Sequence, residues 1–146
     1  MVNTIRNLIT ERFAVNSLLL LFSLVTVFHL LVLLGIIPFE IVWGGRLKNA
    51  DQMIVFECVS LVVNVTMLLV VCLYAGLLRL RVNQKIIIVA LWFMTILFLI
   101  NTVGNLFSAN QTEKIIFTPL TVMLCFFCFR LALSGKNAVS SVENKQ

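Results

Sequence analysis

Four long runs of apolar residues are the feature that most restricts how this chain can fold. They lie at residues 13–37, 53–78, 86–107 and 115–133. Each run holds roughly the 20 residues that a helix needs to cross a bilayer core of about 30 Å. Apolar residues make up 61% of the chain and charged residues 12%, which is too little charge to cover a water-soluble domain of this size. The sequence therefore predicts an all-α integral membrane protein, a bundle of four transmembrane helices.

The connections between these runs are short, with one exception. Residues 39–52, which follow Pro38, form a longer polar loop between the first and second spans. We expect residues 1–134 to form a single transmembrane domain, because one chain of this length usually folds as one unit. Residues 135–146 are polar, and we expect them to form a disordered cytoplasmic tail.

The Lys and Arg residues gather on one side of the predicted bundle. Eight of the eleven lie in the N-terminal segment, in the turn after the second span and at the C-terminal end. Cytoplasmic loops of membrane proteins carry the excess of these residues, so both termini are predicted to be cytoplasmic. The short loops and small size favour a bacterial inner membrane. The net charge of +5 then serves orientation and contact with the lipid bilayer, and no basic stripe with interleaved aromatic residues points to nucleic acid.

Polar side chains within the apolar runs gather at one depth, toward the side opposite the termini. His29 lies in the first run, Glu57 and Asn64 share a helix face in the second, and Asn101 and Asn105 are one turn apart in the third. Polar groups are costly in a membrane and usually face the bundle interior or a cavity. We therefore expect an outward-facing pocket. Asn64 and His29 would form its floor, and Glu57, Asn101 and Asn105 its walls.

The polar loop above this layer contains Trp43, a Gly-Gly pair and Arg46. Glycines permit backbone angles that other residues avoid, so the loop can fold Trp43 and Arg46 over the mouth of the pocket as a lid. A tryptophan at the headgroup level is equally typical of the ordinary aromatic belt of a membrane protein.

Glu57 is the residue on which a function would depend most. An acid within an apolar span is a candidate proton carrier, cation ligand or general acid/base, and His29 could share a proton with it. A structural role is the alternative. Asn and His side chains hydrogen-bond between helices and stabilise packing by roughly 1 kcal/mol each. Glu57 could instead pair with Arg46 or Lys48.

Three functions fit these features. The first is a protein that binds or transports a small amphipathic or cationic ligand, either a small molecule or a lipid. The second is a non-catalytic subunit or an oligomeric channel, in which several copies of the chain would assemble. The third, which ranks below the others, is a membrane-embedded enzyme that uses Glu57 and His29 on a lipid-like substrate. No cofactor is predicted, and a single histidine argues against a conventional zinc site.

Overall fold

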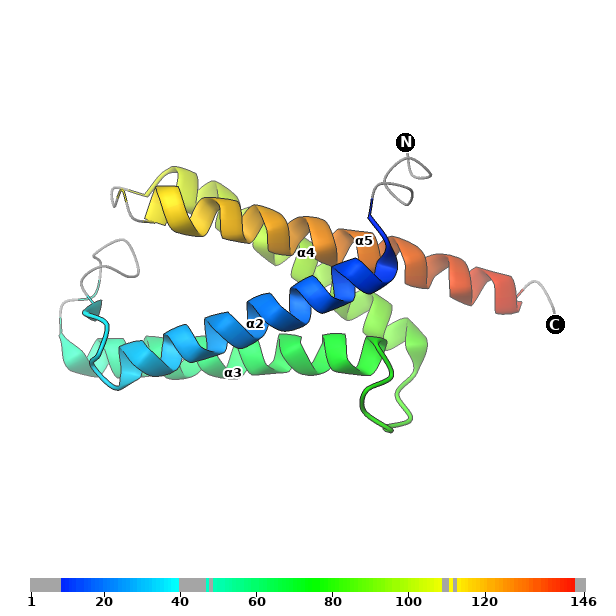
Figure 1. Cartoon of the computed structure of the whole chain (residues 1–146), viewed down its shortest axis with the longest axis horizontal. Coiled ribbons are helices and arrows are strands. Elements are labelled where there is room, and N and C mark those ends of the chain that lie inside the picture. The colour runs from blue at the N-terminus through cyan, green and yellow to red at the C-terminus, as the bar shows by residue number, and fades with distance from the viewer. Residues whose placement is uncertain (1–8, 40–46, 48, 109–110, 112, 144–146) are drawn as a thin grey trace.

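A computed structural model shows four long helices in the chain (Figure 1). It describes residues 9–39, 47, 49–108, 111 and 113–143. The helices are α2 (Glu11–Leu33), α3 (Ala50–Tyr74), α4 (Gln84–Leu106) and α5 (Thr118–Glu143), and the short π-helix η3 (Glu113–Phe117) leads into α5. Four helices in this part of the chain are long and apolar enough to cross a membrane. The predicted all-α membrane bundle is therefore confirmed in its architecture.

Asparagine and threonine side chains set where three of the helices begin. The side-chain oxygens of Thr10, Asn49 and Asn83 accept hydrogen bonds from backbone N–H groups in the first turns of α2, α3 and α4. Such caps satisfy donors that have no partner within the helix. Because Asn49 caps α3, this helix begins at Ala50, three residues before the predicted start of the second span.

Glycines end two helices earlier than predicted. α2 ends at Leu33, ahead of Pro38, and α3 ends at Tyr74 rather than at residue 78. Gly35 and Gly76 follow these helices with a φ of 70°. At each glycine, its own N–H and that of the next residue donate to carbonyls of the last helical turn, over 2.9 to 3.1 Å. This is the Schellman arrangement, which favours glycine because its φ is positive.

The fourth helix is longer than predicted. α5 continues past the predicted end of the fourth span at residue 133 and is helical to Glu143. Extending a helix by one residue is far easier than starting a new one. A polar composition after the membrane span therefore does not stop a helix that the span has already established.

The four helices form two hairpins that cross each other (Figure 1). α2 packs extensively on α3, and α4 on α5, whereas α3 and α4 contact each other little. We call the end where α2 begins and α5 ends the closed end, because α2 also reaches α5 there and the hairpins come together. At the opposite end, which we call the open end, the two hairpins lie apart (Figure 1).

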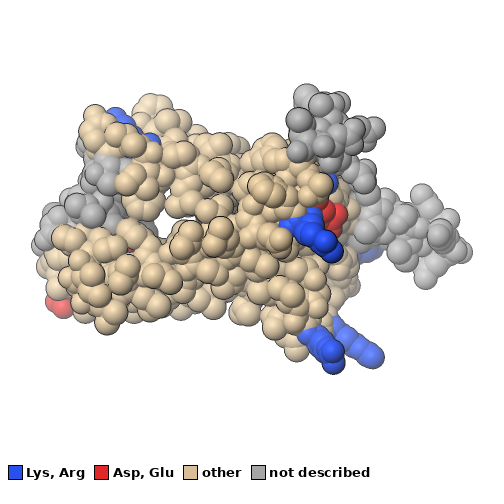
Figure 2. All heavy atoms as spheres, viewed as in Figure 1, with Lys and Arg blue, Asp and Glu red and all other residues tan. Residues whose placement is uncertain are grey.

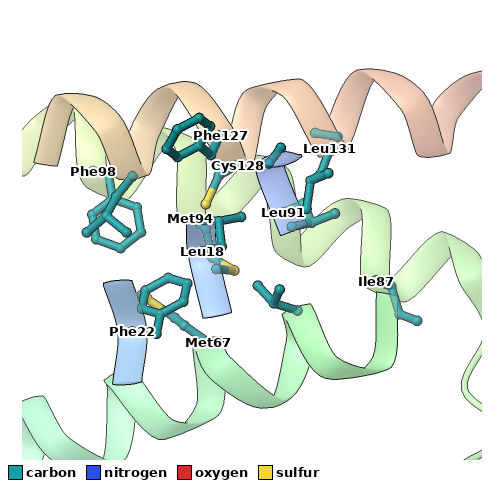
Figure 3. Packing of buried hydrophobic residues seen from close by; sticks show 14 residues of the cluster. Leu18, Phe22, Met67, Ile87, Leu91, Met94, Phe98, Phe127, Cys128 and Leu131 are labelled. Atoms are coloured by element: carbon teal, nitrogen blue, oxygen red, sulfur yellow. The ribbon is translucent and has the colours of Figure 1, made fainter. Parts of the chain in front are cut away.

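A core of buried apolar side chains joins the hairpins on the closed side of the molecule (Figure 3). All four long helices contribute to it. Its members include Leu18 and Phe22 of α2, Met67 of α3, Leu91, Met94 and Phe98 of α4, and Phe127, Cys128 and Leu131 of α5. Many other large apolar side chains are exposed on the outer faces of the helices, as expected for contact with lipid.

Polar contacts fasten the closed end. Arg130 of α5 is buried, and its Nε donates to the carbonyl of Ile9, 2.9 Å away, just before α2. Its guanidinium also donates to the hydroxyl of Ser134 one turn along α5. The hydroxyl of Tyr74, at the end of α3, donates to Glu11 Oε1 over 2.7 Å. These bonds tie α2 to both α5 and α3.

Helix α5 approaches α4 closely at Gly135. A β-carbon placed on this residue would lie 2.7 Å from Ile88 Cγ1 and 3.6 Å from Tyr74 Cε2. The first of these distances is shorter than real contacts of a β-carbon. A glycine therefore permits the approach, as small residues commonly do where membrane helices meet.

Candidate functional site

A cavity of about 600 Å³ lies between the two hairpins, on the open side of the apolar core. Side chains from all four long helices line it. In the same half of the molecule, Figure 2 shows an opening that passes between the hairpins. The volume falls within the range of pockets that hold a small organic ligand.

His29 and Glu57 meet in the wall that α2 and α3 provide. Nδ1 of His29 lies 2.6 Å from Oε2 of Glu57. His29 is about one turn from the end of α2 and Glu57 about two turns into α3, so the antiparallel helices bring them to the same level. Glu57 is fully buried, and His29 is largely buried. A short hydrogen bond between an acid and an imidazole is strong, so it joins α2 and α3 firmly at this level.

Two aromatic rings lie in a row beside the imidazole. The ring of Phe28 packs edge-on against His29, with 5.9 Å between the ring centres, and against Phe117 of η3 at 5.6 Å. Phe28 and Phe117 both line the cavity. The edge of the cavity between α2 and α5 is therefore aromatic.

Asn64 lines the cavity too, but its amide joins two helices. Nδ2 of Asn64 donates to the carbonyl of Phe22 over 3.0 Å and to Oγ1 of Thr26 over 2.6 Å. Both acceptors belong to α2, so the bonds link α2 to α3. The structural role that we considered for the polar residues accordingly describes Asn64 better than a role in ligand contact does.

The floor of the cavity differs from the one that we predicted. His29 lies at the level of Glu57, near the open end, and so does not lie beneath it. Met67, Phe98 and Leu124, which are buried members of the apolar core, line the cavity on the side of the closed end. The cavity is consequently polar toward the open end and apolar toward the middle of the bundle.

The second hairpin contributes further polar groups. Asn105 of α4 donates to Oγ1 of Thr121 of α5 over 3.5 Å, and Thr102 donates to the same hydroxyl over 2.9 Å. Asn101 is exposed and lines the cavity, as does the partly buried Ser60 of α3. Within the part of the chain that the structure describes, neither the Asn101 carboxamide nor the Ser60 hydroxyl forms a hydrogen bond.

The structure thus brings five of the predicted site residues to one cavity: His29, Glu57, Asn64, Asn101 and Asn105. The remaining two, Trp43 and Arg46, lie outside the described residues.

Sequence reasoning did not single out Thr26 and Thr102, which connect helices. Thr26 receives the amide of Asn64, and Thr102 bonds across to Thr121. A threonine in a membrane helix commonly bonds to a carbonyl of its own helix, as Thr26 and Thr102 also do. Its position in the sequence therefore does not reveal which other helix it touches.

The cavity can hold a polar group by hydrogen bonds at one end, where the His29–Glu57 pair lies, and an apolar group at the other. Among the described residues, no group of three or more His, Cys, Asp and Glu side chains could hold a metal ion. Comparison of the chain with families of known proteins, with curated proteins and with solved structures gives no match.

Proposed function

We propose that this protein binds a small amphipathic ligand in the cavity between its hairpins, as the receiving site of a binding or transport protein. The observation that supports this most directly is the cavity itself. It has about 600 Å³ of space, walls from all four helices and a polar end that contains a fully buried acid. A structural network alone would not require an open space of this size, because protein interiors are normally close-packed.

Two polar side chains that lack hydrogen-bond partners among the described residues also support a bound ligand. Asn64 and Thr121 form bonds between helices and so support the packing. Asn101 and Ser60 form none within the described residues, yet both line the cavity. A carboxamide in a membrane span is costly unless it has a partner. A bound ligand would supply that partner.

The distribution of Lys and Arg supports the direction in which the site faces. The closed end carries the start of α2, the turn at residues 75–83, the start of α4 and the C-terminal part of α5. These segments hold most of the Lys and Arg residues, and such segments usually stay in the cytoplasm. The open end, and with it the polar part of the cavity, then faces the exterior.

Replacing Glu57 by Gln tests the proposal. Glutamine keeps the shape of the side chain and can still accept a hydrogen bond from His29, so the variant is expected to fold. Asp51→Asn is the matched control, because it makes the same change on an exposed position of the same helix. Purified protein in lipid nanodiscs would be titrated with decanol as a neutral probe and with tetraphenylphosphonium as a cationic one.

We expect Glu57→Gln to weaken the binding of whichever probe the wild type takes by about tenfold or more, since a hydrogen bond to a charged group contributes roughly 1.5–3 kcal/mol. Asp51→Asn should bind like the wild type. Equal affinities in all three proteins would remove Glu57 from the site and contradict the proposal.

Acid/base catalysis is a second candidate, and the contact between His29 and Glu57 favours it specifically. Two groups that exchange a proton beside a ligand are what a membrane-embedded isomerase or hydrolase needs. Mass spectrometry of the bound probes after incubation separates the two functions. A probe that returns unchanged from the wild type supports binding, whereas a product that is absent with Glu57→Gln supports catalysis.

A further inference from the structure

The geometry points to a specific class of ligand for this cavity: a neutral lipid with a single hydrocarbon chain, which enters sideways from the bilayer rather than from water. This inference rests on the proposed function of the same cavity and adds its route of access and its chemistry.

The cavity opens toward the side of the bundle, where lipid would lie. Figure 2 looks across the helices, and the opening between the hairpins passes through the molecule in that direction. Three apolar residues line the cavity and are also exposed: Leu24 (56%), Val63 (42%) and Ile116 (56%). These three residues form the rim of the cavity. On one side of the bundle, α3 and α4 contact each other little. A ligand that crosses the rim leaves the hydrocarbon of the bilayer and enters a space lined by apolar side chains.

The polarity of the cavity matches the orientation of a lipid in the outer leaflet. His29, Glu57 and Asn105 lie toward the open end, whereas Met67 and Leu124 lie toward the middle of the bundle. With the open end outside, a lipid of that leaflet has its head at the level of the polar group and its chain pointing to the apolar floor. It could therefore move in without turning over.

The size of the cavity selects among lipids. Its volume of about 600 Å³ lies in the range of pockets for small organic ligands. That space suits one hydrocarbon chain with a small head. A phospholipid with two chains would have to leave one of them in the bilayer.

The rim of the cavity selects the head. Its exposed residues Leu24, Val63 and Ile116 are all apolar. A head that carries a charge of either sign would have to lose its water before it crossed this rim, which is costly in hydrocarbon. A hydroxyl or carbonyl head avoids this cost and can bond to Asn101 and Ser60.

Photo-crosslinking in nanodiscs tests this inference. The probe is hexadecanol that carries a diazirine on its chain, and competitors are unlabelled hexadecanol, hexadecyltrimethylammonium, palmitate and butanol. Val63→Trp narrows the rim, and Val62→Trp is its control. Val62 precedes it on α3, is 67% exposed and does not line the cavity.

We expect the probe to label peptides that line the cavity and hexadecanol to displace it better than the two charged competitors by about tenfold. Butanol, which has the head without the chain, should compete poorly. Val63→Trp should lower labelling of the cavity peptides by about tenfold. Val62→Trp should label like the wild type, because a tryptophan that faces lipid leaves the cavity open.

Three results would overturn the inference, and they separate it from the proposed function. Labelling that butanol abolishes, or that Val63→Trp leaves unchanged, would mean access from water; the cavity would still be a binding site. Stronger competition by either charged lipid would refute the neutral head alone. If the probe does not label the cavity of the wild type and no competitor binds there, the proposed function is refuted as well.

Discussion

The close approach of Gly135 to Ile88 allows the packing of the closed end to be tested with a single methyl group. In Gly135→Ala the new β-carbon would start 2.7 Å from Ile88 Cγ1 and 3.2 Å from Ile88 Cδ1. Cγ1 is held close to the backbone, so it cannot swing away as the end of a long side chain would. Helices α4 and α5 would have to separate by several tenths of an ångström. Gly104→Ala is the control, because nothing lies within 4 Å of a β-carbon at that position.

The magnitude follows from two opposing terms. Alanine favours a helix over glycine by about 1 kcal/mol, and both glycines lie in helices, so this gain is common to the two variants. Overpacking a close contact costs about 1–3 kcal/mol, and this term applies to Gly135 alone. We therefore expect Gly104→Ala to be slightly more stable than the wild type. Gly135→Ala should be less stable than Gly104→Ala by about 1–3 kcal/mol.

Reversible unfolding in mixed detergent micelles, followed by circular dichroism, measures these differences. The double variant Gly135→Ala/Ile88→Ala removes the clashing atoms, so the two substitutions should be non-additive, with a favourable coupling of about 1 kcal/mol or more. If Gly135→Ala were as stable as Gly104→Ala, the tight approach of α5 to α4 would not exist in solution.

Three further predictions concern other parts of the molecule. Gly76→Ala places a β-carbon on a residue with a φ of 70°, so the free energy of unfolding should fall by about 1–2 kcal/mol in the same micelle assay. Asn64→Leu should lower the free energy of unfolding by about 1 kcal/mol, because the α2–α3 link is lost. Asn101→Leu should leave stability nearly unchanged and weaken probe binding instead. The opposite result would mean that Asn101 supports the packing and Asn64 binds the ligand. In a variant without the native cysteines, Arg81→Cys should react with a membrane-impermeant maleimide only after the cells are opened, and labelling of intact cells would place the closed end outside.

The four spans could be predicted because length and hydropathy suffice to identify a transmembrane helix. Their ends were less predictable, because a glycine with positive φ can stop a helix before the apolar run is over. This is why α2 ends at Leu33 although apolar residues continue to Ile37. In the same way, the change to polar composition after residue 133 marked the end of the membrane span and not the end of α5.

The level at which the candidate site lies could be predicted, but its contacts could not. Apolar residues cover these helices on nearly all sides, so the 3.6-residue pattern that identifies the buried face of a soluble helix is largely absent. In α3 the buried residues include Met53, Glu57, Asn64 and Met67. Only the two polar ones stand out from their neighbours in the sequence. The partner of Glu57 stayed open for the same reason, since His29 was one of several candidates and the rotation of α2 was unknown.

The way in which the chain connects the two hairpins has a mechanical consequence. It passes from one hairpin to the other through residues 75–83, at the closed end, whereas α2 and α4 end and α3 begins at the open end (Figure 1). The two hairpins are therefore joined at the closed end, where Arg130, Tyr74 and the apolar core hold them together. Moving the hairpins apart at the open end would break few contacts within either hairpin. It would instead break contacts between the hairpins, such as the ring contact of Phe28 with Phe117.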